Sequence, residues 1–189
     1  MTWTPEETVK IIFYIGGQTM EKWDLFDGNR QPLNRTHIRG DNMISGEYHI
    51  VVSIWTVNSD KEILLTLRHP DKKMYPNFWE NTAGSVLAGE NSRSGAVREL
   101  FEETGISVTE DELVLLGTRK EETAFWDTYI VRKDISISNL KMQEGETQAA
   151  QWVTLEELDE MIINEDIALP VSERLEPMRK KFEDYLFDY

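Results

Sequence analysis

The sequence predicts a domain of the α/β or α+β class, in which a mixed β-sheet is covered by helices on both faces. Three observations favour this class. Runs of β-branched and aromatic residues separated by turn signals indicate strands, the longest at residues 49–57. Apolar residues recur at helical spacing in the middle of the chain, over residues 92–104. A second apolar stripe at helical spacing lies between residues 172 and 186.

The length and apolar content set the number of domains. With 189 residues, of which 40% are hydrophobic, the chain can bury one sizeable core but is short for two. We therefore expect a single domain over residues 20–189, preceded by an N-terminal extension over residues 1–19. Two adjacent glycines stand shortly before Met20, and their codons can form a purine-rich ribosome-binding stretch, so Met20 is a candidate native start. The alternative is an edge strand over residues 9–14.

The composition excludes several classes of function. The net charge of -15 would repel a nucleic-acid duplex over most of the surface, although a small phosphorylated ligand can still bind locally. Cysteine is absent, which rules out disulfides, thiolate metal sites and cysteine nucleophiles and fits a cytoplasmic protein. No apolar run reaches the roughly 18 residues that span a bilayer, and we expect no membrane partner.

The N-terminal half reads as two hairpins and a loop. A short apolar run followed by the turn sequence Asp-Gly-Asn predicts a small hairpin that begins at residues 23–29. Residues 49–57 and 63–67 predict a longer hairpin around the polar turn at 58–61. Residues 71–77, with prolines at their edges, predict a loop.

The C-terminal half alternates helices and strands. A helix is expected from Ser92 or Ser94 to Thr104, with Gly105 as its C-terminal stop. A capping box of Thr154 and Glu157 predicts the start of a further helix. The remaining expected elements are strands at 113–118, 124–131 and 149–153, a polar acidic connection at 136–145, and a last helix over much of 172–186, with Pro177 in its first turn or at a kink.

Three carboxylates share one face of the central helix. Glu99, Glu102 and Glu103 occupy positions i, i+3 and i+4, and nothing cationic is expected on that face to neutralise them. Like charges at this spacing destabilise a helix, which argues for a missing counter-ion; the alternative for the helix taken alone is a solvated acidic face. Oxygen ligands favour magnesium, manganese or calcium over zinc, and magnesium is the natural choice.

A glycine-containing loop precedes this helix and completes a motif. The segment from Thr82 to Glu90 can bring backbone carbonyls and amides close to the helix start. The combined pattern resembles the Nudix box of MutT-like hydrolases at every constrained position: Gly84, Glu90, Arg98-Glu99-Leu100, Glu102-Glu103 and Gly105-Ile106. The box spans residues 84–106, and a weaker similarity extends over residues 22–165.

The resemblance implies an α/β/α sandwich with a mixed sheet and a catalytic loop-helix-loop. It also implies that Glu99, Glu102 and Glu103 bind Mg²⁺, with Mn²⁺ as an alternative, and that the carbonyl of Gly84 completes the coordination. The expected reaction is attack by an activated water on a diphosphate bridge whose oxygens the metal neutralises.

Further site residues follow from the same resemblance. Arg98 and Glu90 would form an ion pair that orients the catalytic glutamates. Glu146, six residues before Trp152, is the candidate metal ligand or base outside the box, with Glu144 as competitor. Either acid is as readily a solvated loop residue.

Several basic and aromatic residues are candidates for substrate binding. The phosphate-binding candidates are Arg68, Lys72 and Lys73, although exposed lysines are common. Aromatic side chains that could stack on a base or cover an isoprenoid chain, but mostly fit a core, are Trp55, Tyr75, Trp79, Phe125 and Trp126. The scattered His37, His49 and His69 receive no catalytic role.

Two other functions compete with hydrolysis of a nucleoside diphosphate linked to another moiety. The segment from Trp23 to Trp79 is similar to the subgroup that includes isopentenyl-diphosphate isomerase, but those isomerases use a cysteine near the position of Gly84, and this chain has none. A non-catalytic sensor of nucleotide metabolites usually loses box glutamates, and all are present here. The sequence leaves open whether the chain forms a homodimer.

Overall fold

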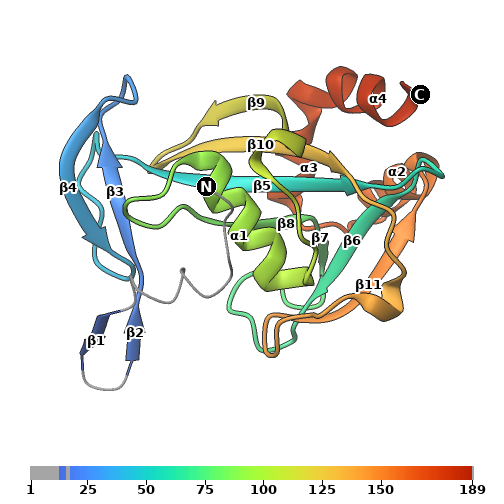
Figure 1. Cartoon of the computed structure of the whole chain (residues 1–189), viewed down its shortest axis with the longest axis horizontal. Helices are drawn as coiled ribbons and strands as arrows, with labels where there is room; N and C mark the ends of the chain where they lie inside the picture. The colour runs from blue at the N-terminus through green and yellow to red at the C-terminus, as the bar shows by residue number, and fades with distance from the viewer. Residues whose placement is uncertain (1–12, 16–17, 189) are drawn as a thin grey trace.

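A seven-stranded mixed sheet forms the centre of the molecule, in a computed structural model that describes residues 13–15 and 18–188 (Figure 1). The strand order is β11-β6-β5-β10-β9, with β7 beside β6 and β8 beside β5. The predicted mixed-sheet class is therefore confirmed. The strands of this sheet are β5 (His49–Val57), β6 (Ile63–Arg68), β7 (Trp79–Glu80), β8 (Thr82–Ser85), β9 (Val114–Lys120), β10 (Ala124–Arg132) and β11 (Thr147–Val153).

The sheet divides where a hairpin was predicted. β5 and β6 pair only at Val57 and Ile63, so the expected long hairpin is wrong beyond its turn. The reason is that β5 pairs in parallel with β10 along one edge and antiparallel with β8 along the other. β6 instead pairs with β7 and β11. The chain from β7 to β8 thus crosses from β6 to β5, and the cavity described below lies at this division.

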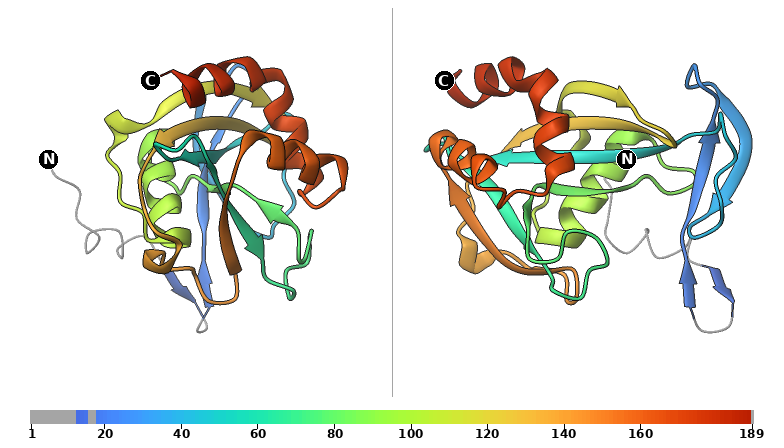
Figure 2. Two further views of the ribbon diagram at one scale, coloured as in Figure 1. Left: turned by 90° about the vertical axis from the view of Figure 1, so that its right-hand side faces the viewer. Right: turned by 180° about the vertical axis from the view of Figure 1, so that it is seen from behind.

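Helices cover both faces of the sheet. α1 (Ser92–Thr104) packs on one face, and α3 (Leu169–Leu175) and α4 (Arg179–Phe187) pack on the other (Figure 2). α1 is held at its start by Asn91, whose side chain accepts hydrogen bonds from two backbone amides, and it ends at Gly105 with a φ of 75°. Its buried residues include Ala96, Val97 and Leu100, as the apolar spacing predicts.

The C-terminal helices follow their sequence signals with one interruption. α2 (Leu155–Ile163) begins with the predicted capping box between Thr154 and Glu157. The expected last helix is divided by a 3₁₀ turn, η4 (Glu176–Met178), because Pro177 has no amide hydrogen to donate. Both parts still bury the predicted stripe, which consists of Leu175, Met178, Phe182 and Leu186.

Two small hairpins stand beside the main sheet. β3 (Lys22–Phe26) pairs with β4 (Pro32–Ile38) around the predicted turn. β1 (Phe13–Ile15) pairs with β2 (Gln18–Met20). Most of the expected extension at 1–19, and most of the alternative strand at 9–14, lies outside the described residues, so the domain boundary stays a prediction. Within the described residues, none of the helices has both the length and the apolar content needed to cross a membrane.

Candidate active site

A cavity of about 500 Å³ lies beside the carboxylate face of α1. Glu99, Glu102 and Glu103 line it, and so do Gly84 and Ser85 of β8. The opposite wall comes from β6, β7 and the segment before β11. The structure thus brings the box glutamates together with side chains that are distant in sequence, and these are Arg68, Lys72, Glu80, Gln143, Glu146 and Thr147.

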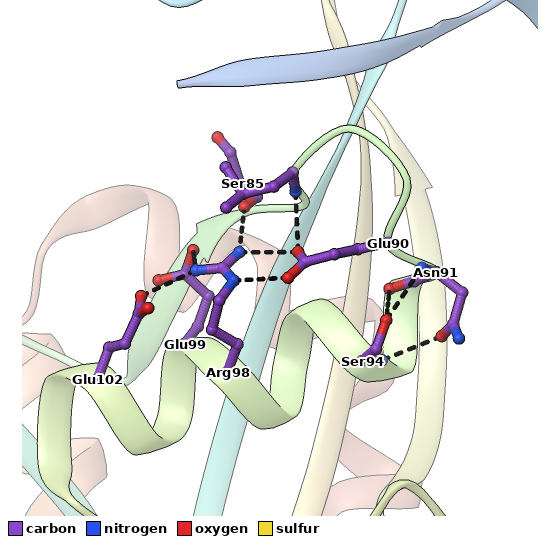
Figure 3. Close-up of polar contacts among 8 residues, drawn as sticks. Ser85, Glu90, Asn91, Ser94, Arg98, Glu99 and Glu102 are labelled. Atoms are coloured by element: carbon purple, nitrogen blue, oxygen red, sulfur yellow. Dashed lines mark hydrogen bonds and ion pairs between the residues drawn. The ribbon is translucent and has the colours of Figure 1, made fainter. Parts of the chain in front are cut away.

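Arg98 is the centre of the polar network on α1 (Figure 3). Its guanidinium donates to both oxygens of Glu90, at 2.8 and 3.0 Å, so the expected ion pair is present. The same group donates to Glu99 and to Glu102, each at 2.9 Å, and to the carbonyl oxygen of Ser85, also at 2.9 Å. The expectation that this face has no cation is therefore wrong, because the long Arg98 side chain curls back to its helical neighbours.

Glu90 holds the loop that leads into α1. Besides its bond with Arg98, its carboxylate accepts a hydrogen bond from the backbone amide of Leu87 at 2.9 Å. Glu90 does not line the cavity, and its position beneath Arg98 makes it a support for that side chain. Arg98 itself is buried, with 4% of its surface exposed. A buried ion pair of this kind fixes geometry more than it adds stability.

The carboxylates of the cavity carry more negative charge than Arg98 offsets. Burial raises the pKa of Glu99 to about 7, against the opposing effect of Arg98. Burial, together with the charges of Glu99, Glu80 and Glu146, raises the pKa of Glu103 well above its ordinary value. Burial also raises the pKa of Glu80, although Arg68 opposes the shift. A cation bound in the cavity would favour the ionised form of these groups and so lower their pKa values.

The loop side of the cavity contains a second ion pair. Lys72 pairs with Glu146 and so connects the loop after β6 to the segment before β11. The amide of His69 also donates to the Glu146 carbonyl oxygen at 2.8 Å. Glu146 is therefore held at the cavity wall, whereas its competitor Glu144 is exposed and does not line the cavity.

Arg68 is engaged with its own loop. Its Nη1 donates to both oxygens of Glu80 at 2.7 Å. Its Nε and Nη2 donate to the carbonyl oxygens of Met74 and Tyr75, at 2.9 to 3.1 Å. One guanidinium hydrogen remains for a ligand in this arrangement. Lys73, the third basic candidate, is exposed and is not among the cavity-lining residues.

The donor chemistry of the cavity fits a divalent cation that prefers oxygen. Six carboxylates line it, and among the residues that the structure describes they are not arranged as a ready-made cluster of three metal-ligating side chains. Three ion pairs hold these carboxylates apart, since Arg98 pairs with Glu99 and Glu102 and Lys72 pairs with Glu146. A dipositive ion carries the charge to compete with these cations for the same oxygens.

Sequence reasoning missed several residues of the cavity. Glu80 precedes Gly84 closely but has no periodic or motif signal of its own. Lys22 and Arg39 reach the cavity because the β3–β4 hairpin lies against β5, and His49 lines it from the start of β5 itself; spacing alone does not reveal either placement. Of the aromatic candidates only Trp126 lines the cavity. Trp55 and Phe125 are buried, and Trp79 packs against the hydrophobic cluster that includes Leu175 of α3.

Comparison with known proteins gives relatives for most of the chain. The NUDIX domain model matches residues 47–174. An uncharacterised Nudix hydrolase of Listeria monocytogenes is 39% identical over 146 residues, which are 74% of this chain and 83% of that protein. An isopentenyl-diphosphate Delta-isomerase of Paenarthrobacter aurescens is 30% identical over 92 residues, which are 48% of this chain and 50% of that protein.

Solved structures share the fold. A protein of Deinococcus radiodurans aligns with a TM-score of 0.67 at 22% identity, over 85% of this chain and 98% of that one. The NUDIX domain of NrtR from Shewanella oneidensis, crystallised with ADP ribose, aligns with a TM-score of 0.56 at 16% identity, over 71% of this chain and 88% of that one. At these identities the likeness concerns the fold alone.

Proposed function

This chain belongs to the NUDIX domain family and is a hydrolase of diphosphate linkages, and on that basis we propose that it requires a divalent cation and cleaves a nucleoside diphosphate linked to another moiety. Magnesium is the proposed cation, with manganese as an alternative. One observation carries the proposal: five carboxylates from α1, β7 and the segment before β11 line one cavity, together with the basic side chains of Arg68 and Lys72.

The proposed cation ligands are the box glutamates and one residue beyond the box. Glu99, Glu102 and Glu103 project from one face of α1, and Glu146 approaches from the other wall. The carbonyl oxygen of Gly84 is the proposed backbone ligand, since the Glu99 side chain lies against this residue. When bound, the cation neutralises phosphate oxygens and makes the phosphorus easier for water to attack.

The basic residues have a different proposed role. Lys72 is placed to contact a phosphate oxygen when the Glu146 carboxylate turns to the cation, because that movement breaks the ion pair and frees the Lys72 ammonium. Arg68 contributes its remaining hydrogen and holds the wall through Glu80. Lys73, on the same loop, is the weaker candidate because it is exposed and is not among the cavity-lining residues.

The general base is one of the cavity carboxylates. Glu103 and Glu146 both line the cavity, and neither is engaged by Arg98. A base must reach the attacking water and have a pKa near the working pH. Burial moves the pKa of Glu103 upward, in the direction that improves a carboxylate as a base.

An activity panel tests the proposal. The metal-free protein is incubated with and without Mg²⁺ and with nucleoside diphosphate sugars, ADP ribose, dinucleotide polyphosphates, nucleoside triphosphates, NADH, thiamine diphosphate and isopentenyl diphosphate. We expect Mg²⁺-dependent release of a nucleoside monophosphate from at least one nucleotide compound. Migration of the double bond in isopentenyl diphosphate, or binding of nucleotides without turnover, would contradict the proposal.

A further inference from the structure

The cavity extends from the carboxylates across the face of three neighbouring strands. Because Val51 pairs with Ser85 on β8 and with Trp126 on β10, these three side chains share one face of the sheet. His49 lies two residues before Val51 and points the same way. All four line the cavity. Two strand spacings, about 10 Å, separate Ser85 from Trp126 along this floor.

Trp126 is a fixed aromatic surface at the end of this floor. The guanidinium carbon of Arg174 lies 3.3 Å from the centroid of the indole ring and so covers one side of it. Arg174 is itself held by two hydrogen bonds to Glu121, each 2.8 Å. The ring is only partly buried, and the part that lines the cavity is left for a ligand. A flat ring that is already packed on one face stacks on a ligand at low entropic cost.

His49 adds an unused polar group to the same wall. The ring is 8% exposed and stacks on Trp23, with 4.1 Å between ring centroids and 12° between planes. Its Nδ1 has no hydrogen-bond partner. Burial, followed by the charge of His37, lowers the pKa of His49 to about 4, so the ring is neutral at physiological pH. A buried polar atom without a partner is costly unless a ligand satisfies it.

We propose that His49 and Trp126 form the subsite for the nucleobase of the substrate, with the base stacked on Trp126 and its polar edge facing His49. This proposal rests on the proposed function, because the diphosphate must lie at the carboxylates for the base to reach the far wall. The separation of about 10 Å along the floor leaves room for a sugar ring between the two ends.

The chemistry of this wall suits a base better than an isoprenoid chain. An apolar chain would leave the His49 nitrogen unpaired and would meet Lys22 and Arg39 at the rim. A base has a flat face for Trp126 and hydrogen-bonding atoms on its edge for a neutral imidazole. Arg39 pairs with Glu21 at 2.8 Å, so the rim presents a paired charge in place of an open phosphate site.

Ligands that cannot be hydrolysed test nucleobase binding independently of catalysis. The α,β-methylene diphosphates of adenosine, guanosine, cytidine and uridine are titrated into the protein by calorimetry with Mg²⁺, and methylenediphosphonate without a nucleoside is the reference. At least one nucleoside analogue is expected to bind about 10-fold more tightly than the reference. Affinities no better than the reference for all four bases would overturn the proposal, whether or not the protein hydrolyses any diphosphate.

Variants then assign the preference to the two residues. Trp126→Leu should abolish the nucleoside advantage, that is, the tighter binding of the nucleoside analogues relative to methylenediphosphonate. The affinity for methylenediphosphonate itself should stay unchanged. Trp126→Phe should keep most of the nucleoside advantage. His49→Phe keeps the ring stack on Trp23 and should reduce discrimination among the four bases. Phe187→Ala, which removes an exposed aromatic ring outside the cavity, is the matched control. A preserved nucleoside advantage in Trp126→Leu, or an equal loss for both ligand classes, would overturn the assignment.

Discussion

The carboxylate of Glu99 occupies the space where Gly84 would carry a side chain. A Cβ atom built on Gly84 would lie 2.1 Å from Cδ of Glu99 and 2.3 Å from each of its carboxylate oxygens. Real contacts of this length do not occur, so β8 must have glycine here for Glu99 to approach its backbone. The glycine of the motif and its first helical glutamate are therefore one unit of the site.

Gly84→Ala should displace Glu99 and remove most activity. The loss of stability should be small, because only the flexible end of the Glu99 side chain has to move, and unfolding in urea measures it. The cost should fall in the background of Glu99→Ala, because the clashing carboxylate is then absent. Equal destabilisation by Gly84→Ala with and without the Glu99 side chain would show that the contact is not what the glycine serves.

The stability of the metal-free protein should fall as the pH rises, through Glu99. Its pKa is raised to about 7 in the folded protein from 4.5. A raised folded pKa stabilises the fold fully below about pH 4.5, and this contribution is lost as the pH rises through about 7. The free energy of unfolding should fall by on the order of 3 kcal/mol over this pH range.

Glu99→Gln isolates this effect from other titrating groups. Urea unfolding in EDTA at pH 5 and pH 8.5 should show the variant gaining stability relative to wild type at the higher pH. Added Mg²⁺ should reduce that advantage by neutralising the wild-type carboxylate. A stability difference that does not change with pH would contradict the burial of this charge.

Arg98→Met should destabilise the protein by about 3–5 kcal/mol, because it leaves the largely buried Glu90 carboxylate without its cationic partner. Arg98→Lys should recover only part of the loss, since one ammonium cannot form the paired hydrogen bonds with Glu90 and reach Glu99 and Glu102 as well. The double variant Arg98→Met with Glu90→Gln should be less destabilised than the sum of the single changes. Additive effects would mean that the pair does not act as a unit.

Glu146→Gln should lower the turnover number and shift the pH–rate profile, since it removes a cavity carboxylate and breaks the pair with Lys72. Lys72→Met should raise KM more than it lowers kcat, and its effect on KM should exceed that of Lys73→Met. Glu144→Gln tests the competing acid. An unchanged turnover number and pH–rate profile in Glu146→Gln would remove this residue from the mechanism, and a loss in Glu144→Gln would transfer the role.

The parts of this protein that follow from the sequence are those set by local rules. The helix over residues 92–104, its stop at Gly105, the capping box at Thr154 and the run at residues 49–57 were all predictable, because caps and apolar spacing act within a few residues. The single-pair contact of β5 with β6 was not predictable. It depends on β8 pairing with the β5 edge that β6 would otherwise occupy, while β10 takes the opposite edge, and this is a property of the whole sheet.

The candidate site divides in the same way. Spacing alone indicated that Glu99, Glu102 and Glu103 share a face, because their separation matches the helical repeat. The reach of Arg98 to Glu99 and Glu102 depends on its rotamer, and spacing does not fix a rotamer. Glu80 and His49 enter the cavity through sheet pairing and hairpin docking, and no pattern in their own neighbourhood marks them.

The central claim is that the carboxylates of α1 hold a divalent cation. The most direct test is the Mn²⁺ affinity of Glu103→Gln, measured from the electron paramagnetic resonance signal of the free ion. Wild type and the control Glu160→Gln, an exposed acid on α2, should bind with equal affinity. Glu103→Gln should bind about 10-fold more weakly or worse, with turnover reduced by about 100-fold or more. A Glu103→Gln protein that binds Mn²⁺ as tightly as wild type would contradict the account.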